Sequence, residues 1–194
     1  MSNAISSWAF LKDGIPNLMA LLISLAIVLT TMAPRAFAQT ELAIEHRLPL
    51  TTAMEAATTA ITTCASQGAA VSASVVDQHG QTLLQLRGDL SAPHTYGLSL
   101  QKAYTAVSLA PIQGVISTSE VSARLRSTNQ AIGELALPSS PIPGIIGVPG
   151  GIIIKTEANE LLGALGVSGA SSGLQDEKCV YAGLDAIKES LGKD

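Results

Sequence analysis

The chain has 194 residues and a formal net charge of −4, which is long enough for one domain with a hydrophobic core. Only 13% of its residues are charged and 3% are aromatic. The chain therefore has neither the basic patch nor the stacking rings of a nucleic-acid-binding protein, and we expect no nucleic-acid partner. Two cysteines, Cys64 and Cys179, are too few for a disulfide-rich scaffold or a cysteine-based zinc site.

The amino terminus carries the pattern of an export signal. Residues 15–32 are almost all apolar, and Ala36, Phe37 and Ala38 form an A-x-A cleavage signature just after Pro34. We therefore expect residues 1–38 to be a cleaved signal peptide and the protein to be periplasmic or secreted, with membrane contact only before cleavage. The alternative is an uncleaved anchor, because the run approaches the roughly 18 residues that span a bilayer.

After a polar lead-in at residues 39–49, the domain is expected to begin with a helix that has a buried apolar face. Thr52 and Glu55 have capping-box spacing near its start. Pro111 and Gly114 are expected to end the second helix. The first half is thus predicted to contain a helix at 52–67, strands at 71–77 and 81–87, and a helix at 96–109.

The second half is organised around a glycine-bounded pair of apolar runs at 147–155 and 161–170, which predicts two strands of a hairpin. Ser117 and Glu120 form a second capping-box pattern. Because tight turns join antiparallel strands, we expect an α+β fold with a helix-covered antiparallel sheet. The other predicted elements are a helix at 117–132, a proline-broken connection at 137–144, a short strand at 145–146, and a last helix after Ser172.

Several short motifs occur in one order along residues 50–192. They are Ser74–Asp77 with Gly80, Lys102–Ala106, Pro149–Ile152, Gly163–Ala170 and Asp176–Leu184. Through these motifs and their order, the chain resembles the GlcG/HbpS family of haem-binding proteins. It is also similar to the related carboxy-terminal domain of propanediol-utilisation corrinoid adenosyltransferases. The resemblance implies a profilin-like, five-stranded antiparallel sheet flanked by helices. It also implies homo-oligomers that bind haem or a related tetrapyrrole, sometimes with haem degradation or redox sensing. The chain departs from the family pattern at residues 90–95 and 111–116.

Given a haem ligand, His94 is the candidate axial ligand of the iron, because it lies in a loop that leads into the Lys102–Ala106 motif. The alternative is an exposed loop histidine without a ligand. His79, in a tight turn, and His46, in the lead-in, are expected to be exposed and solvated.

Lys102 and Thr105 lie one helical turn apart, where lysine could neutralise a propionate and threonine could bond a carboxylate or iron. Alternatively, the lysine reaches to the surface and the threonine bonds back to its helix. Gly150 and Gly151 could present backbone N–H groups to an anionic ligand group. They could equally serve close packing of the backbone.

Cys64 and Cys179 lie on the first and last predicted helices, and two alternatives remain open for them. Export would permit a disulfide between them. Otherwise they are two buried small hydrophobic residues.

Three functions are consistent with these patterns. The first is an exported tetrapyrrole-binding protein that is non-catalytic or weakly redox-active and works as a homo-oligomer. The second is an enzyme acting on haem or on a small organic acid through Lys102 and Thr105. The third is a structural or interaction protein without a ligand.

Overall fold

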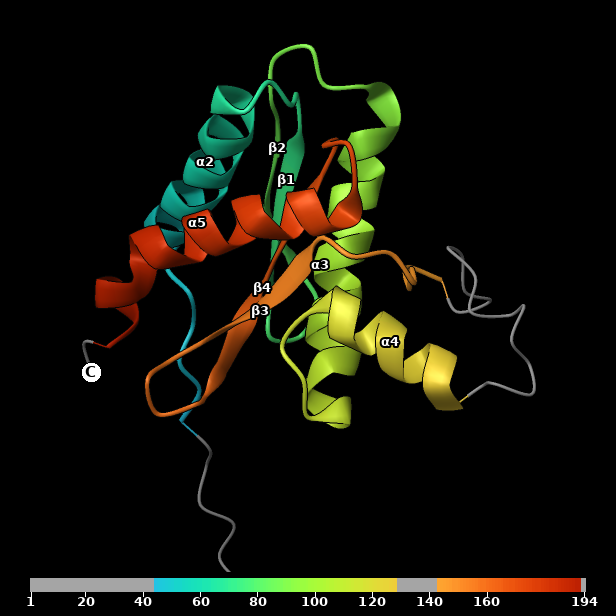
Figure 1. Ribbon diagram of the computed structural model, residues 1–194. Coiled ribbons are helices and arrows are strands. Elements are labelled where there is room, and N and C mark those ends of the chain that lie inside the picture. The colour runs from blue at the N-terminus through green and yellow to red at the C-terminus, as the bar shows by residue number, and fades with distance from the viewer. Residues whose placement is uncertain (1–43, 129–142, 193–194) are drawn as a thin grey trace, which may run out of the picture. The chain divides into compact units, whose positions relative to one another are not determined.

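The computed structural model describes residues 44–128 and 143–192, and within them four helices and four strands follow one another (Figure 1). The expected order of elements is confirmed. In chain order they are α2 (Leu50–Ser66), β1 (Ser72–Asp77), β2 (Thr82–Arg87), α3 (Pro93–Gln113), α4 (Thr118–Thr128), β3 (Gly151–Lys155), β4 (Leu161–Ser168) and α5 (Gly173–Leu191).

The strands form one antiparallel sheet in the order β2-β1-β4-β3, so two hairpins meet along β1 and β4. The α+β class and the β3–β4 hairpin are confirmed. A fifth strand is not found among the described residues. At the β3 edge an isolated bridge joins Ser117 to Ile152, with Ile153 N donating to Ile116 O at 2.9 Å. The chain turns into α4 at Thr118, and it therefore leaves the sheet edge after one bridge.

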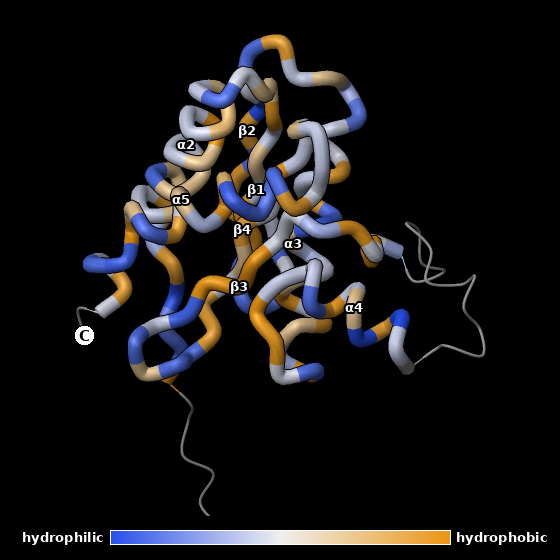
Figure 2. The backbone as a smooth tube through the Cα atoms, in the orientation of Figure 1, coloured by the Kyte–Doolittle hydropathy of each residue, from blue (hydrophilic) through white to orange (hydrophobic). Residues whose placement is uncertain are grey.

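Helices cover both faces of the sheet: α2 and α5 pack on one face, and α3 packs on the other with α4 beside it (Figure 1). Each interface contains its own apolar cluster, and Figure 2 shows hydrophobic residues along the strands. The α2–α5 side includes Ala56, Ala60, Val75, Leu165 and Ile187, and the α3 side includes Val76, Ala103, Val107, Val121 and Ile153.

Helix α3 lies unusually close to the sheet because two glycines face it. Gly151 and Gly166 are paired in register on β3 and β4. A Cβ on Gly151 would lie 2.7 Å from the carbonyl carbon of Lys102, and one on Gly166 would lie 2.5 Å from Ala103 N. Only glycine leaves room for the helix backbone at these two positions.

Several predicted element boundaries are wrong. Helix α2 begins at Leu50 without a side-chain cap, so the Thr52 capping box does not exist. Helix α3 begins at Pro93, whose fixed φ suits a first turn, and continues through Pro111 to a left-handed end at Gly114. A proline in the last turn removes one intrahelical bond there and does not stop the helix. The predicted strand at 145–146 is reduced to a single-residue bridge at Ile146.

Two predicted helix starts are confirmed. Ser117 Oγ accepts from Glu120 N at 3.3 Å, while Glu120 Oε2 accepts from Ser117 N at 3.1 Å, which is a reciprocal capping box. Ser172 Oγ accepts from Gln175 N at 3.2 Å at the start of α5. The same Glu120 carboxylate also accepts from Ile116 N, so it fixes the turn that leads from α3 to α4.

Residues 44–49, the described part of the lead-in, are bonded through histidine–carboxylate pairs to the β1–β2 turn and the β3–β4 turn. His46 Nδ1 lies 2.7 Å from Glu160 Oε2, and His79 Nε2 lies 2.6 Å from Glu45 Oε1. Both histidines are exposed, as predicted, but each has a protein partner. The hydrogen bond from His46 lowers the pKa of Glu160.

The predicted signal segment and most of the proline-broken connection lie outside the described residues. None of the helices described is long and apolar enough to cross a membrane.

The two cysteines form a buried disulfide between α2 and α5. Their Cα atoms are 5.6 Å apart, and the bond joins positions separated by 115 residues. Small residues permit this close approach: Ala53, Ala56, Ala57 and Ala60 line the buried face of α2, and Gly183 of α5 has no room for a Cβ beside Ala56. Cys64 and Cys179 are therefore disulfide-bonded, and the alternative of two separate buried thiols is wrong.

Replacing both cysteines with alanine should lower the free energy of unfolding by about 5 kcal/mol, because the disulfide closes a long loop in the unfolded chain. Urea denaturation of the oxidised protein and the double variant measures the difference. The reduced wild-type protein should behave like the variant. Equal stability of all three forms would contradict the expected contribution.

Candidate functional site

Lys102 forms a buried ion pair at the centre of the fold. Its side chain is 2% exposed, and Nζ donates to Asp176 Oδ2 at 2.7 Å and to Val167 O at 3.0 Å. Burial lowers the pKa of Lys102, while the nearby carboxylates of Asp176 and Glu177 oppose this shift. Asp176 lies in the first turn of α5, where the helix dipole favours a carboxylate.

Glu177 joins the same cluster from the next position of α5. Its Oε1 accepts from Ser119 N at 2.9 Å, Gly150 N at 3.2 Å and Thr118 Oγ1 at 3.3 Å. Thr118 Oγ1 in turn accepts from Gly151 N at 2.9 Å. The backbone N–H groups of both glycines thus meet acceptors supplied by the protein itself. We call Lys102, Thr118, Asp176, Glu177 and the two glycines the buried junction.

Thr105 lies one turn beyond Lys102 and is also buried. Its Oγ1 accepts from Ile146 N at 2.8 Å, which ties the segment before β3 to α3. The structure therefore brings four of the five predicted ligand-binding residues together, namely Lys102, Thr105, Gly150 and Gly151. Their polar atoms are already bonded within the protein, so a ligand would have to displace these bonds.

His94, the fifth predicted residue, lies apart from the junction. It occupies the first turn of α3 and is exposed. Eight residues separate it from Lys102, which corresponds to about 12 Å along the helix at about 1.5 Å per residue. The predicted set is therefore divided between an exposed histidine at the helix start and a buried cluster near its middle.

A series of buried hydroxyl groups fixes the start of α3 against β1. Ser72 Oγ lies 2.8 Å from Thr95 Oγ1, and Ser74 Oγ lies 2.7 Å from Ser99 Oγ. These contacts were not predicted from the sequence. The signal was present in the alternating serines of the 71–77 strand, because two small polar residues on one strand face need hydrogen-bond partners when they are buried.

A surface hollow of about 620 Å³ lies where α3 begins. Leu90 at its edge is 97% exposed and has a φ of 64°, a conformation that branched and bulky side chains rarely adopt. Arg87 holds this loop, because Nε and Nη2 donate to Ser91 O at 3.1 and 2.6 Å. We call this the α3 hollow; it is lined by Gln67, Gly68, Ala69, Ala70, Leu90, Ala92, Gly169, Ser171 and Gln175.

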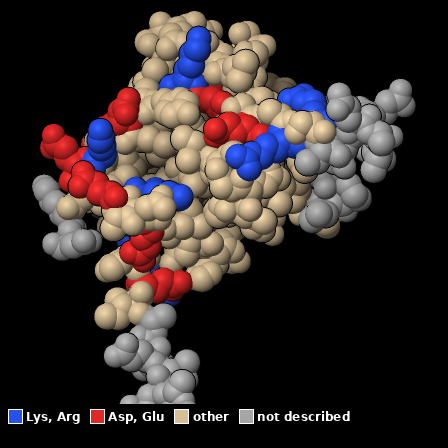
Figure 3. All heavy atoms as spheres, turned by 60° about the horizontal axis from the view of Figure 1, so that its bottom comes forward, with Lys and Arg blue, Asp and Glu red and all other residues tan. Residues whose placement is uncertain are grey.

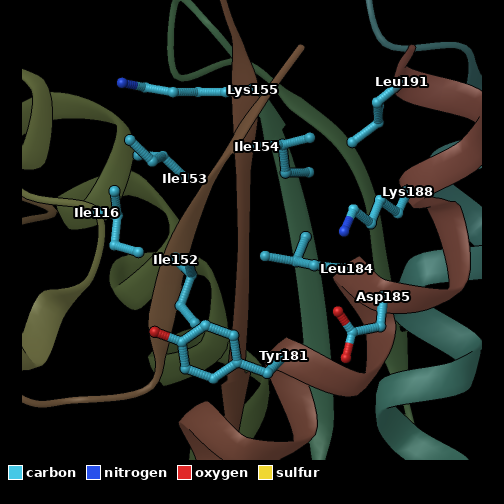
Figure 4. Close-up of a pocket in the computed structure, with 10 residues that line it drawn as sticks. All are labelled: Ile116, Ile152, Ile153, Ile154, Lys155, Tyr181, Leu184, Asp185, Lys188 and Leu191. Carbon is cyan, nitrogen blue, oxygen red and sulfur yellow. The ribbon is translucent and has the colours of Figure 1, made fainter. Parts of the chain in front are cut away.

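A second hollow of about 290 Å³ lies between β3 and α5, and we call it the β3–α5 hollow (Figure 4). Its lining is largely apolar, with Lys188 and Asp185 at its edge.

On the face shown in Figure 3, acidic and basic side chains alternate between uncharged residues, without an extended area of one sign. No group of three or more His, Cys, Asp or Glu side chains in the described ranges could hold a metal ion.

A family model described as haem-degrading protein HbpS-like matches residues 48–185. The chain belongs to the HbpS-like family. The resemblance drawn from the short motifs is thereby confirmed, and those motifs now have structural roles: Lys102, Gly150, Gly151 and Asp176 all belong to the buried junction.

Solved structures agree with this family. A double mutant of HbpS from Streptomyces reticuli is 33% identical, with a TM-score of 0.64 over 80% of this chain and 97% of that one. Protein ORFY of Klebsiella pneumoniae is 26% identical, with a TM-score of 0.59 over 77% and 97%. A PduOC:heme complex, at 23% identity and a TM-score of 0.57 over 73% and 96%, shares the fold. No curated protein matches the chain significantly.

Replacing Lys102 with methionine should lower the free energy of unfolding by about 3–5 kcal/mol, because the substitution leaves the Asp176 carboxylate buried without its partner. Lys102→Met combined with Asp176→Leu should cost less than the sum of the single changes. Urea denaturation tests both expectations. Exposed Lys178→Met on α5 is the control and should change stability by less than about 0.5 kcal/mol. A stable Lys102→Met variant would show that the pair is not structural.

Proposed function

We propose that this protein binds haem or a related tetrapyrrole, and that it does so after export. The observation that carries the proposal is the match to the haem-degrading HbpS-like family over residues 48–185. A relative with the same fold was solved as a heme complex, which supports the same ligand class. The buried junction supports the fold, and the ligand is therefore assigned to an exposed part of the molecule.

The α3 hollow fits a tetrapyrrole better than the buried junction does. Its volume of about 620 Å³ lies within the range of about 300–1,000 Å³ that is typical of small-molecule sites. Leu90 offers an exposed apolar side chain in a strained conformation, and strain of this kind often marks binding loops. The junction, in contrast, has no unbonded polar group to offer.

Residues in and near the α3 hollow would contact different parts of the bound tetrapyrrole. His94, two positions after the lining residue Ala92, would supply a neutral imidazole to iron. Leu90 and the alanines of the lining would cover the apolar ring. The side-chain amides of Gln67 and Gln175, which are bonded to each other in the structure, would turn to the propionates. Bound haem would supply the redox chemistry of iron, while the chain binds and orients it.

Titration of hemin into the purified protein should produce a sharp Soret band that saturates. His94→Ala should shift the band and weaken binding about tenfold, which corresponds to about 1.4 kcal/mol. His79→Ala is the matched control, because it removes another exposed histidine that is paired with Glu45, and it should leave the titration unchanged. A featureless titration of the wild-type protein would overturn the proposed function.

Haem degradation is the second candidate, and the description of the matching family favours it. The same titration separates the two functions when a reductant such as ascorbate is added to the complex. A binding protein keeps its Soret band under these conditions. Loss of the band, with new absorption from an opened tetrapyrrole, would favour degradation. Equal loss with free hemin in buffer would show that the protein does not contribute.

Export is a separate part of the proposal and rests on the apolar run at 15–32 and the A-x-A signature that ends at Ala38. The disulfide between α2 and α5 agrees with an oxidising compartment. Expression of the full chain in a bacterium should yield a mature protein that begins at Gln39. Amino-terminal sequencing of the periplasmic and membrane fractions tests this, and an intact, membrane-bound amino terminus would favour the anchor.

A further inference from the structure

The β3–α5 hollow has the composition of a ligand site that is separate from the α3 hollow. Its floor consists of branched aliphatic side chains from strand and helix, as Figure 4 shows for Ile152, Ile154 and Leu184. Its volume of about 290 Å³ equals that of roughly ten waters at about 30 Å³ each. The hollow can therefore accept a compact apolar body of about that number of atoms.

Lys188 places a positive charge above this apolar floor. In Figure 4 its amine extends from α5 back over Leu184 toward β3. Asp185 lies one turn earlier on the same helix. Neither side chain takes part in any of the ion pairs between residues that the structure describes. A charge beside apolar surface interacts more strongly with a counter-ion than one in bulk water does.

The other polar residues of the lining restrict what can bind. Lys155 is already engaged, because its Nζ donates to Asn159 Oδ1 at 2.9 Å, and in Figure 4 its amine lies on the far side of β3 from Lys188. The ring of Tyr181 lies against Ile152 and closes one end. Burial, with help from Glu177 and Glu120, raises the pKa of Tyr181, so the phenol is uncharged at neutral pH.

We propose that the β3–α5 hollow binds a small organic acid that has one carboxylate and an apolar body. The Lys188 ammonium pairs with the carboxylate, and Ile152, Ile154 and Leu184 pack against the apolar body. The Asp185 carboxylate repels a second negative charge, so monocarboxylates are preferred over dicarboxylates. The site takes a ligand without iron, and its occupancy does not depend on haem binding.

Octanoate is a suitable probe, because its ten or so non-hydrogen atoms match the volume of the hollow. Calorimetric titration of the purified protein should show saturable binding of octanoate and at least tenfold weaker binding of octylamine and of suberate. Lys188→Gln should weaken octanoate binding at least tenfold. Lys155→Gln removes the same charge from the same lining and should leave the affinity within twofold.

Several outcomes would overturn the assignment. These are no saturable octanoate binding, equal binding of octylamine, or an unchanged affinity in Lys188→Gln, which would mean that this lysine only covers apolar surface. Displacement of octanoate by hemin would assign this hollow to the tetrapyrrole instead. Lys188 is exposed, so its replacement should leave the fold intact, and thermal unfolding of each variant verifies this. A protein that binds octanoate but not hemin would refute only the haem proposal.

Discussion

The close approach of α3 to the sheet is the constraint on which the rest of the fold depends. Gly151 and Gly166 sit side by side on adjacent strands and leave room for the helix backbone at Lys102 and Ala103. At this distance the Lys102 side chain cannot reach solvent, and it remains buried beside the sheet. A buried ammonium is tolerated only when it is paired and hydrogen-bonded, and the Asp176 carboxylate and Val167 carbonyl meet that need.

The same junction determines the position of α5, and through it both surface hollows. Asp176 and Glu177 fix the first turn of α5 against α3, α4 and β3, and Cys179 then bonds this helix to α2. Gln175, one residue before the junction, lines the α3 hollow, while Leu184 and Lys188 farther along the helix line the other. A change in the junction would therefore move the walls of both candidate sites together.

The sequence predicted the strands and the hairpin well, because alternating or continuous apolar runs bounded by glycine leave few alternatives. Lys102 was a candidate ligand-binding residue, because it lies one helical turn from Thr105 within a family motif. Its partner Asp176 lies 74 positions away, and no local pattern connects the two. The end of α3 was predicted too early, because proline usually stops a helix. Within the last turn Pro111 removes only one intrahelical hydrogen bond, so the helix continues through it.

Four of the five candidate ligand residues lie within the family motifs and are buried, whereas His94 lies outside the motifs and is exposed. This division explains why the fold could be predicted more fully than the site. In this chain the motifs supply most of the buried junction and the two glycines that leave room for α3, so they specify packing. Leu90 and His94 lie instead in the exposed segment that leads into α3 and in its first turn. A loop held by Arg87 and buried hydroxyl groups can change its exposed side chains without disturbing the junction. Substitutions in this loop should therefore change ligand preference while the junction stays intact, and ligand preference has to be measured there.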